Sequence, residues 1–522
     1  MLRSKHLASC VQRVDNETVD IKNEHGVPVT LFANPQIPIE AEAIEQALSF
    51  VSIEQTLQSL WDQQQAKTIA PFWGDHVGAL QRVVLTPDFH RGSGIPVGTV
   101  AQTSHFVIPQ AVGNDVCCGM RLLMTDITTT ELAPYLDHLA GPLRDVFFRG
   151  KREIPMAPVQ REALLRDGLS GLLDQHRTNA GAGTWQYYDA ATQARDLARV
   201  HFNGSRTARG TFAFADYIKS SGVSDGRDTQ IGSIGGGNHF VELQTVDQII
   251  DGGVAHQWGV QRDHVAIMAH SGSVGLGHVV GGYFADEAKR IFPRSMRRPA
   301  HGFYPIPTTG PHAALAAKYL DAMHNAANFA FANRLFLGLM AIRVLSEVLG
   351  RRVNARLIYD APHNLIWPGA DEQYVHRKGA CPALGPSGEA GSASDPFTFV
   401  GHPVIIPGSM GAASYLLQGQ GNDAALCSAC NGAGRILSRG KSRHVDQAQY
   451  RETFSRLRVV TPIDPTSVEV RTRRDVLAEY HDRLKEEAPY AYKDITPVVT
   501  TVEDAAVAKR VARMWPLLTI KG

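Results

Sequence analysis

The sequence predicts a protein of the α+β fold class. Helical and strand-like stretches are mixed along its 522 residues without a regular β-α-β rhythm, which disfavours a doubly wound parallel sheet. Apolar residues make up 43% of the chain and charged residues 20%, so a sizeable hydrophobic core is expected. No internal repeat at a fixed period is visible.

The expected elements of the N-terminal half begin with a helix from Glu40 to Gln65, within an otherwise mixed segment 1–70. From Gln81 to Met124 the residue pattern is typical of strands and turns. Residues 127–205 are polar and patchily helical. Residues 229–280 alternate short apolar runs with glycine clusters, which predicts strands that end at loops.

In the C-terminal half the clearest helix is alanine-rich, runs from Ala313 to Leu349 and is stopped by Gly350. The stretches ARLIYDAPHN and HPVIIPGSMG each predict a strand followed by a loop. Residues 384–396 predict an exposed, turn-rich loop. RDVLAEYHDRLKEEAP has the pattern of an amphipathic helix.

The formal net charge of +1 excludes a protein that is basic all over, but permits a local basic groove. The first twenty residues lack the apolar stretch of a signal peptide. The longest apolar tract starts at Phe329 and is interrupted by Arg334 and Arg343, so no membrane span is expected. The sequence therefore predicts a soluble protein of the cytoplasm.

Six cysteines in so long a chain do not indicate a disulfide scaffold. For Cys117 and Cys118, a metal-ligand role or burial as a small apolar residue fits better. The spacing Cys427-x-x-Cys430 resembles half of a zinc knuckle or a redox pair. Because no second CxxC completes a zinc site, this is the less favoured interpretation.

Candidate metal ligands recur at the ends of apolar runs. AVGNDVCCGM offers Asp115 and Cys118, GGGNHFVEL offers His239, VAIMAHSGSVGLGH offers His270 and LIYDAPHNL offers His363. One carboxylate, one thiolate and three imidazoles suit Mn, Fe, Co or Zn. Five ligands are more than one tetrahedral metal site needs, and a thiolate can bridge two metals. A site with two metals would suit phosphoryl chemistry. The alternative is that each histidine is a hydrogen-bonded structural residue.

With these motifs, the chain resembles the RtcB family of RNA-splicing ligases. The resemblance runs from about residue 81 to Lys521 and is carried by long motifs in the family's order. These motifs include PDFHRGSG, AVGNDVCCGM, GSIGGGNHFVEL, AHSGSVGLGH, YDAPHN, VHRKGA, PVIIPGSMGAASY, NGAGR and EEAPYAYKD.

The resemblance implies one large domain, 1–522, with mixed and antiparallel sheets flanked by helices around a central metal and nucleotide cleft. Segments 1–70 and 127–205 match less clearly. It implies a ligase that joins an RNA 3′-phosphate or 2′,3′-cyclic phosphate to a 5′-hydroxyl, using GTP and two Mn²⁺ ions, in tRNA splicing or RNA repair. A monomer is expected, with an activator protein as a possible partner.

The resemblance also implies roles for individual residues. Cys118 would bridge two metals, of which Asp115 and His239 complete one and His270 and His363 the other. The implied nucleotide-binding residues are Asn238, Glu242, Lys378, Gly408, Ser409, Ser414, Ala433, Arg435, Tyr492 and Lys521. Asn238 would hold a phosphate, and Glu242, Tyr492 and Lys521 would read the guanine. The alternative without a ligand is that Glu242 and Lys521 are solvated charges and that Tyr492 is a partly buried ring.

The implied catalytic positions are Asp88, Arg435 and Asn431. The family's nucleophile is the histidine of a His-Gly-Ala-Gly-Arg loop, and Asn431 stands in its place. Because the amide lone pair is delocalised, Asn431 cannot attack phosphorus. Metal and GTP binding are expected to survive, whereas guanylylation is expected to be absent or impaired.

Two explanations of Asn431 stay open, a deliberate His→Asn change and a natural paralogue. Val274 and RKGACPAL also depart from the family pattern, since each loses an arginine, and this favours divergence. A catalytically inactive paralogue that binds RNA ends or nucleotide is the alternative function. Cys430 as a substitute nucleophile is a minor hypothesis. Arg149, Lys151 and Arg152 are candidate RNA contacts, although such a run is usually a solvated surface.

Overall fold

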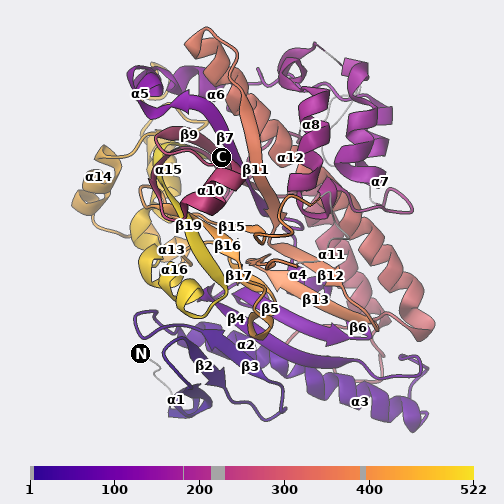
Figure 1. The fold of residues 1–522 in the computed structure, drawn as a ribbon. Helices are drawn as coiled ribbons and strands as arrows, with labels where there is room; N and C mark the ends of the chain where they lie inside the picture. The colour runs from indigo at the N-terminus through magenta and orange to yellow at the C-terminus, as the bar shows by residue number, and fades with distance from the viewer. Residues whose placement is uncertain (1–4, 180, 213–229, 388–394) are drawn as a thin grey trace.

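The computed structural model describes residues 5–179, 181–212, 230–387 and 395–522. Two large β-sheets form its framework, and helices pack around them (Figure 1). The N-terminal strands and helices, in indigo, lie at the bottom of the view. The predicted α+β class with mixed and antiparallel sheets is confirmed. The predicted loop at 384–396 lies partly outside the described residues.

The first sheet has the strand order β1-β2-β3-β4-β5-β13-β12. Its strands are β1 (Val11–Arg13), β2 (Thr18–Ile21), β3 (Val29–Phe32), β4 (Ala79–His90), β5 (Val97–Ser104), β13 (Gln373–Lys378) and β12 (Asn364–Pro368). β3 runs parallel to β4, and the other neighbours are antiparallel. The N-terminal strands therefore extend the sheet whose strand β4 carries Asp88.

The second sheet has the order β11-β7-β9-β8-β19-β16-β15, and β18 pairs with β19 beside this path. Its strands are β7 (Gly119–Thr128), β8 (Phe240–Ile249), β9 (His264–Ser271), β11 (Ala355–Pro362), β15 (Pro403–Ile406), β16 (Ser414–Gly419), β18 (Val459–Val460) and β19 (Ala508–Ile520). Two short pairs join β6 (Phe106–Val107) to β10 (Ile306–Pro307) and β14 (Ala380–Pro382) to β17 (Ser428–Cys430).

The helices surround these sheets. The α-helices are α1 (Lys5–Cys10), α2 (Ala41–Val51), α3 (Ile53–Gln65), α4 (Pro109–Val112), α5 (Thr129–Leu132), α6 (Ala140–Phe148), α7 (Pro158–Asp174), α8 (Ala190–Asp196), α10 (Gly252–Trp258), α11 (Val274–Ile291), α12 (Ala313–Leu349), α13 (Arg439–Ser442), α14 (Gln447–Ser455), α15 (Arg474–Glu486) and α16 (Ile495–Asp504). The 3₁₀ helices are η1 (Ala133–His138), η2 (His176–Asn179), η3 (Gly183–Tyr187), η4 (Leu197–Arg199), η5 (His201–Gly204), η6 (Gly310–His312), η7 (Asp423–Ala425) and η8 (Pro489–Ala491).

Helix α12 is the central helix of the core and has the bounds that the sequence predicts. It ends where Gly350 adopts a left-handed conformation with φ of 66°. Its 37 residues span about 55 Å, which is long enough to cross a membrane. However, 94% of its most apolar 18-residue window is buried inside the protein. The apolar character of α12 is therefore that of a core helix.

The predicted single helix from Glu40 to Gln65 is wrong in one respect, because it is two helices, α2 and α3, which meet at Ser52. The Ser52 hydroxyl donates to the Ser49 carbonyl at 2.7 Å. Serine side chains compete in this way with the helical hydrogen bonds of the main chain. The break lets α2 and α3 both bury apolar side chains and pack against β4.

Segment 229–280 contains the predicted strands, β8 and β9, but two of its parts are helical instead. Asp251 caps α10, because its carboxylate accepts from the Val254 N–H at 3.1 Å. Helix α11 then begins at Val274, directly after β9 and one short turn. Glycine-rich composition suggested loops here, whereas capping and packing against α12 produce helices.

Candidate metal and nucleotide site

The second sheet brings the five predicted metal ligands together at one end of its strands. Cys118 and His239 stand directly before β7 and β8, whereas His270 lies near the end of β9 and His363 directly follows β11. Because β11, β7, β9 and β8 are antiparallel neighbours, the starts of β7 and β8 meet the ends of β11 and β9. Asp115 reaches this edge from the turn before Cys118.

The side chains of this ligand cluster converge on one another. Cys118 Sγ lies 3.1 Å from His239 Nε2 and 3.2 Å from His270 Nε2. His239 Nε2 lies 2.9 Å from Asp115 Oδ2, and His270 Nε2 lies 3.3 Å from His363 Nε2. The ligand atoms of Cys118, His239 and His270 all lie within 4.8 Å of one another. This donor set fits a borderline divalent cation.

The protonation states of the cluster suit a cation as well. Burial lowers the pKa of His270 well below its usual value and that of His363 to about 3, so both rings are neutral. His239 Nδ1 lies 3.1 Å from the Ile234 carbonyl, which leaves Nε2 free to face the cluster. Burial and the Asp115 charge raise the pKa of Cys118, and a bound cation would reverse this effect by stabilising the thiolate.

A buried ion network supports the strands that carry the ligands. Arg334 on α12 is fully buried and donates to Asp360 Oδ1 at 2.9 Å. It also donates to the carbonyls of Cys117 at 2.7 Å and Ser271 at 3.1 Å, which are chain neighbours of Cys118 and His270. Sequence reasoning missed this role, although an arginine within an apolar helix was its visible signal.

A pocket of about 470 Å³ opens beside the ligand cluster, and we call it the Asn431 pocket. The predicted site residues that line it are Asp88, Asn238, Glu242, His270, Gly408, Ser409, Asn431, Ala433, Arg435, Tyr492 and Lys521. Its volume is in the range of small-molecule sites. The sequence motifs that contribute these residues are scattered over more than four hundred positions, and the fold brings them to one pocket.

Asn431 lies where the pocket meets the ligand cluster. In the orientation that satisfies its hydrogen bonds, its amide nitrogen donates to Asp88 Oδ2 and to the Gly379 carbonyl, each at 3.0 Å. Its amide oxygen accepts from His363 Nε2 at 3.2 Å. Burial raises the pKa of Asp88 to about 6, although the Thr86 hydroxyl donates to it at 2.6 Å. Asp88 is thus placed to position the side chain at 431.

The pocket also presents a carboxylate and an ammonium group. Glu242 on β8 accepts from the Thr519 hydroxyl and from Gln244 Nε2, and its burial raises its pKa to about 7. Lys521 follows β19 and donates to the His239 carbonyl at 3.1 Å. Burial lowers the pKa of Lys521 to about 8.

Glu487 links several of the predicted nucleotide residues and was not predicted itself. Its carboxylate accepts from Arg435 Nη1 at 3.2 Å, from Arg439 Nε at 2.9 Å and from the Tyr492 hydroxyl. Arg435 also lies over the Tyr492 ring, 4.9 Å from its centroid. The guanidinium of Arg435 is therefore largely occupied by protein acceptors, which makes it a positioning group in this structure. The motif EEAPYAYKD contained the signal for Glu487.

Two predicted nucleotide residues, Lys378 and Ser414, are not among the described residues that line the pocket. Lys378 Nζ instead donates to the Ser93 carbonyl. The Ser414 hydroxyl accepts from the Gly408 N–H at 3.1 Å and from Gln244 Nε2 at 2.9 Å. Ser414 therefore supports the loop that lines the pocket.

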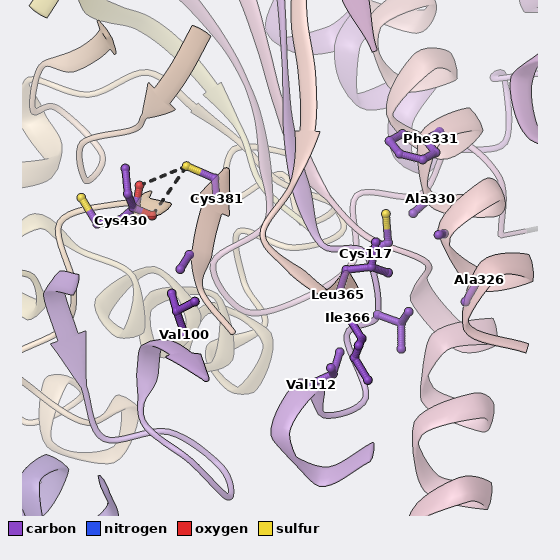
Figure 2. Close-up of a cluster of buried hydrophobic side chains, with 14 of the residues drawn as sticks. Val100, Val112, Cys117, Ala326, Ala330, Phe331, Leu365, Ile366, Cys381 and Cys430 are labelled. Carbon is purple, nitrogen blue, oxygen red and sulfur yellow. Dashed lines mark hydrogen bonds between the residues drawn. The ribbon is translucent and has the colours of Figure 1, made fainter. Parts of the chain in front are cut away.

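The CxxC segment does not resemble a metal site or a reactive thiol. Figure 2 shows Cys430 beside Cys381 in a cluster of apolar side chains. The Cys381 thiol donates weakly to the carbonyls of Ala429 and Cys430, at 3.7 and 3.5 Å. Burial raises the pKa of Cys430 well above its usual value. A protonated, buried thiol is a poor nucleophile.

Comparison with known proteins identifies the family of this chain. The family model described as tRNA-splicing ligase RtcB matches residues 74–522. The chain is 34% identical to the tRNA-splicing ligase RtcB of Nanoarchaeum equitans, over 85% of this chain and 88% of that protein. It is 32% identical to the RNA-splicing ligase RtcB of Mycobacterium tuberculosis, over 85% of this chain and 98% of that protein. The chain belongs to the RtcB family.

Proposed function

We propose that this chain acts on RNA ends as an RtcB-type ligase, with its guanylylation step absent or impaired. The reaction would join an RNA 3′-phosphate or 2′,3′-cyclic phosphate to a 5′-hydroxyl, with GTP and Mn²⁺. The observation that carries the proposal is the convergence of five metal-ligand side chains at one end of the Asn431 pocket. The names of the relatives support the RNA-ligase class.

The ligand cluster would hold two Mn²⁺ ions. Cys118 would bridge them, with Asp115 and His239 on one ion and His270 and His363 on the other. When bound, such ions stabilise the negative charge that develops on a reacting phosphate. The chain's own contribution is to keep the His270 and His363 imidazoles neutral and to direct the ligand nitrogens at one point.

The rest of the Asn431 pocket would hold GTP. Ionised Glu242 would accept from the guanine N1–H and exocyclic amine, and Tyr492 would offer a stacking face. Lys521 and Asn238 line the same pocket, and Asn238 would hold a phosphate. The basic stretch near Lys151 gives no support for an RNA contact, because Lys151 and Arg149 both pair with Asp145.

A second function is favoured by the contacts of Asn431. Its amide nitrogen has partners on Asp88 and the Gly379 carbonyl that do not depend on the imidazole assigned to the metals, which is what a stable binding site needs. The chain would then recognise RNA ends or nucleotide without turnover. Its RNA binding would weaken steeply with salt, because phosphate contacts dominate such affinity.

Substitution of the bridging cysteine tests the metal site. We expect Cys118→Ala to lose both Mn²⁺ ions, because the thiolate would be shared between them. We also expect the intact chain to open a 2′,3′-cyclic phosphate on RNA with Mn²⁺, and the variant to lose this activity. Equilibrium dialysis with Mn²⁺ and gel analysis of the RNA ends are the measurements.

The adjacent cysteine provides the control for this experiment. Cys117 is equally buried but packs against α12 and is not part of the ligand cluster (Figure 2). Cys117→Ala should therefore keep Mn²⁺ binding. Retention of two Mn²⁺ ions by Cys118→Ala would contradict the assigned cluster. RNA binding without cyclic-phosphate opening by the intact chain would favour the non-catalytic function.

The pH dependence of GTP binding tests the role of Glu242. Its pKa in the free protein is raised to about 7, whereas bound guanine would favour the ionised carboxylate. Binding therefore releases a proton below pH 7, and affinity should rise about tenfold per pH unit up to that value and then level off. Titration calorimetry from pH 5.5 to 7.5 measures this. Glu242→Gln should bind GTP more weakly, and its affinity should no longer rise with pH below pH 7. The titration of GTP itself contributes equally to both proteins.

A further inference from the structure

A second pocket lies apart from the site described above. It has a volume of about 480 Å³ and lies between α8, α12 and the start of β11, in the upper right of Figure 1. We call it the arginine pocket, because five arginines line it together with two aspartates. The charged residues are Arg121, Arg195, Arg199, Arg352, Arg356, Asp189 and Asp196. None of them lines the Asn431 pocket.

The charges of the arginine pocket are incompletely neutralised. The Arg356 guanidinium makes no hydrogen bond or ion pair with any residue that the structure describes. Arg199 Nη1 reaches only two main-chain carbonyls, at 3.4 and 3.5 Å. The Asp189 carboxylate caps α8, because it accepts a hydrogen bond from the Thr192 N–H at 2.7 Å. Arg121 is already paired with Asp360 at 3.1 Å. The remaining four arginines therefore face Asp196 as the aspartate of the pocket that is free to balance them.

The arginines form a base and a rim. Arg121 and Arg199 are buried at 2% and 8% exposure, and Arg195, Arg352 and Arg356 are exposed around them. Burial, followed by the neighbouring charge of Arg356, lowers the pKa of Arg199 to about 10. Arg121 Nε is buried and has no partner among the described residues. Like charges held together around a concave surface repel one another and attract an anion.

The chemistry of the walls indicates which anion. Guanidinium groups present planar forks of N–H donors that match the oxygens of phosphate. Arg352 lies over the Tyr187 ring at 4.5 Å, which adds a flat wall beside the charges. We propose that the arginine pocket binds a small molecule that carries several phosphate groups. The pocket has room for a few phosphate groups but not for a polynucleotide. The inference does not depend on the proposed RNA chemistry.

The experiment measures hydrogen exchange of the full chain with tripolyphosphate as the probe, at low salt and with a chelator present. Tripolyphosphate should slow amide exchange in segments 189–199 and 352–356. Arg356→Gln should raise the half-saturating concentration for this protection at least about tenfold, since it removes charge-assisted hydrogen bonds to the anion. Arg356 is exposed, so its substitution should leave the fold intact.

Arg262→Gln is the matched control, because it removes the same charge from an exposed site whose ion pair is with its neighbour Asp263 at 3.8 Å. It should leave the protection unchanged. Equal weakening by the two variants, or absence of protection in both segments at millimolar tripolyphosphate, would overturn the proposal. Protection by a 5′-phosphorylated oligoribonucleotide but not by tripolyphosphate would overturn it in favour of an RNA contact. Arg195→Gln, on the rim, provides a second variant should Arg356→Gln fail to fold.

Discussion

Asn431→His should give a protein that becomes covalently labelled with GMP when it is incubated with GTP and Mn²⁺. An imidazole at this position supplies the nucleophilic nitrogen that an amide lacks. Asp88 already faces the side chain at 431 and would accept a hydrogen bond from the ring, which would fix its tautomer. Loss of a nucleophile typically costs several orders of magnitude in rate, so the gain should be of that size. Labelling with α-phosphate-labelled GTP and mass spectrometry of the loop peptide measure it.

Two controls accompany this variant. Asn431→Gln keeps an amide and should stay unlabelled, and Asn431→His combined with Cys118→Ala should lose the label together with the metals. A histidine variant that binds GTP and Mn²⁺ but gains no label would contradict the assignment of position 431. Val274 would then be the first residue to examine. It begins α11 with φ of 50°, which is strained for a β-branched residue. The resemblance to the family leads us to expect an arginine at this position.

The sequence was most informative where one local pattern decides the structure. The bounds of α12 follow from an alanine-rich apolar run and the glycine that ends it. The strands β8, β9 and β11 follow from short apolar runs, and the ligands at their ends follow from the motifs. Once β7, β9 and β8 are antiparallel neighbours, Cys118, His239 and His270 must approach one another.

Other features depend on partners that are distant in sequence. Glu487 gains its role only when β19 and the segment near Arg435 come together around it. Lys378 belongs to a matching motif, and its ammonium group donates to the carbonyl of Ser93, a residue of the pocket wall, without lining the pocket itself. The helical start of α11 was missed because its glycines resemble a loop in isolation, whereas tertiary packing decides in favour of the helix.

Arg334→Leu should have the largest effect on stability. Arg334 and Asp360 are both fully enclosed, and removal of the arginine leaves a buried carboxylate with Arg121 as its remaining charged partner. Breaking such a pair from one side typically costs about 3–5 kcal/mol in the free energy of unfolding. The carbonyls of Cys117 and Ser271 lose a donor in addition. Urea unfolding measures the loss.

The same substitution tests how the fold holds the ligand cluster. Because those two carbonyls are next to Cys118 and His270 in the chain, Arg334→Leu should also weaken Mn²⁺ binding by about 10–100-fold, as outer-shell changes do. Arg343→Leu on the same helix is the control. Arg343 pairs with Glu347 at 2.9 Å and donates to the Lys151 carbonyl at 2.9 Å, but it touches no residue next to the ligand cluster. Its loss should therefore destabilise the protein less than the loss of Arg334 and leave metal binding unchanged. Equal effects of the two substitutions would show that α12 only fills the core, whereas a larger metal effect at Arg334 would show that it also positions the ligands.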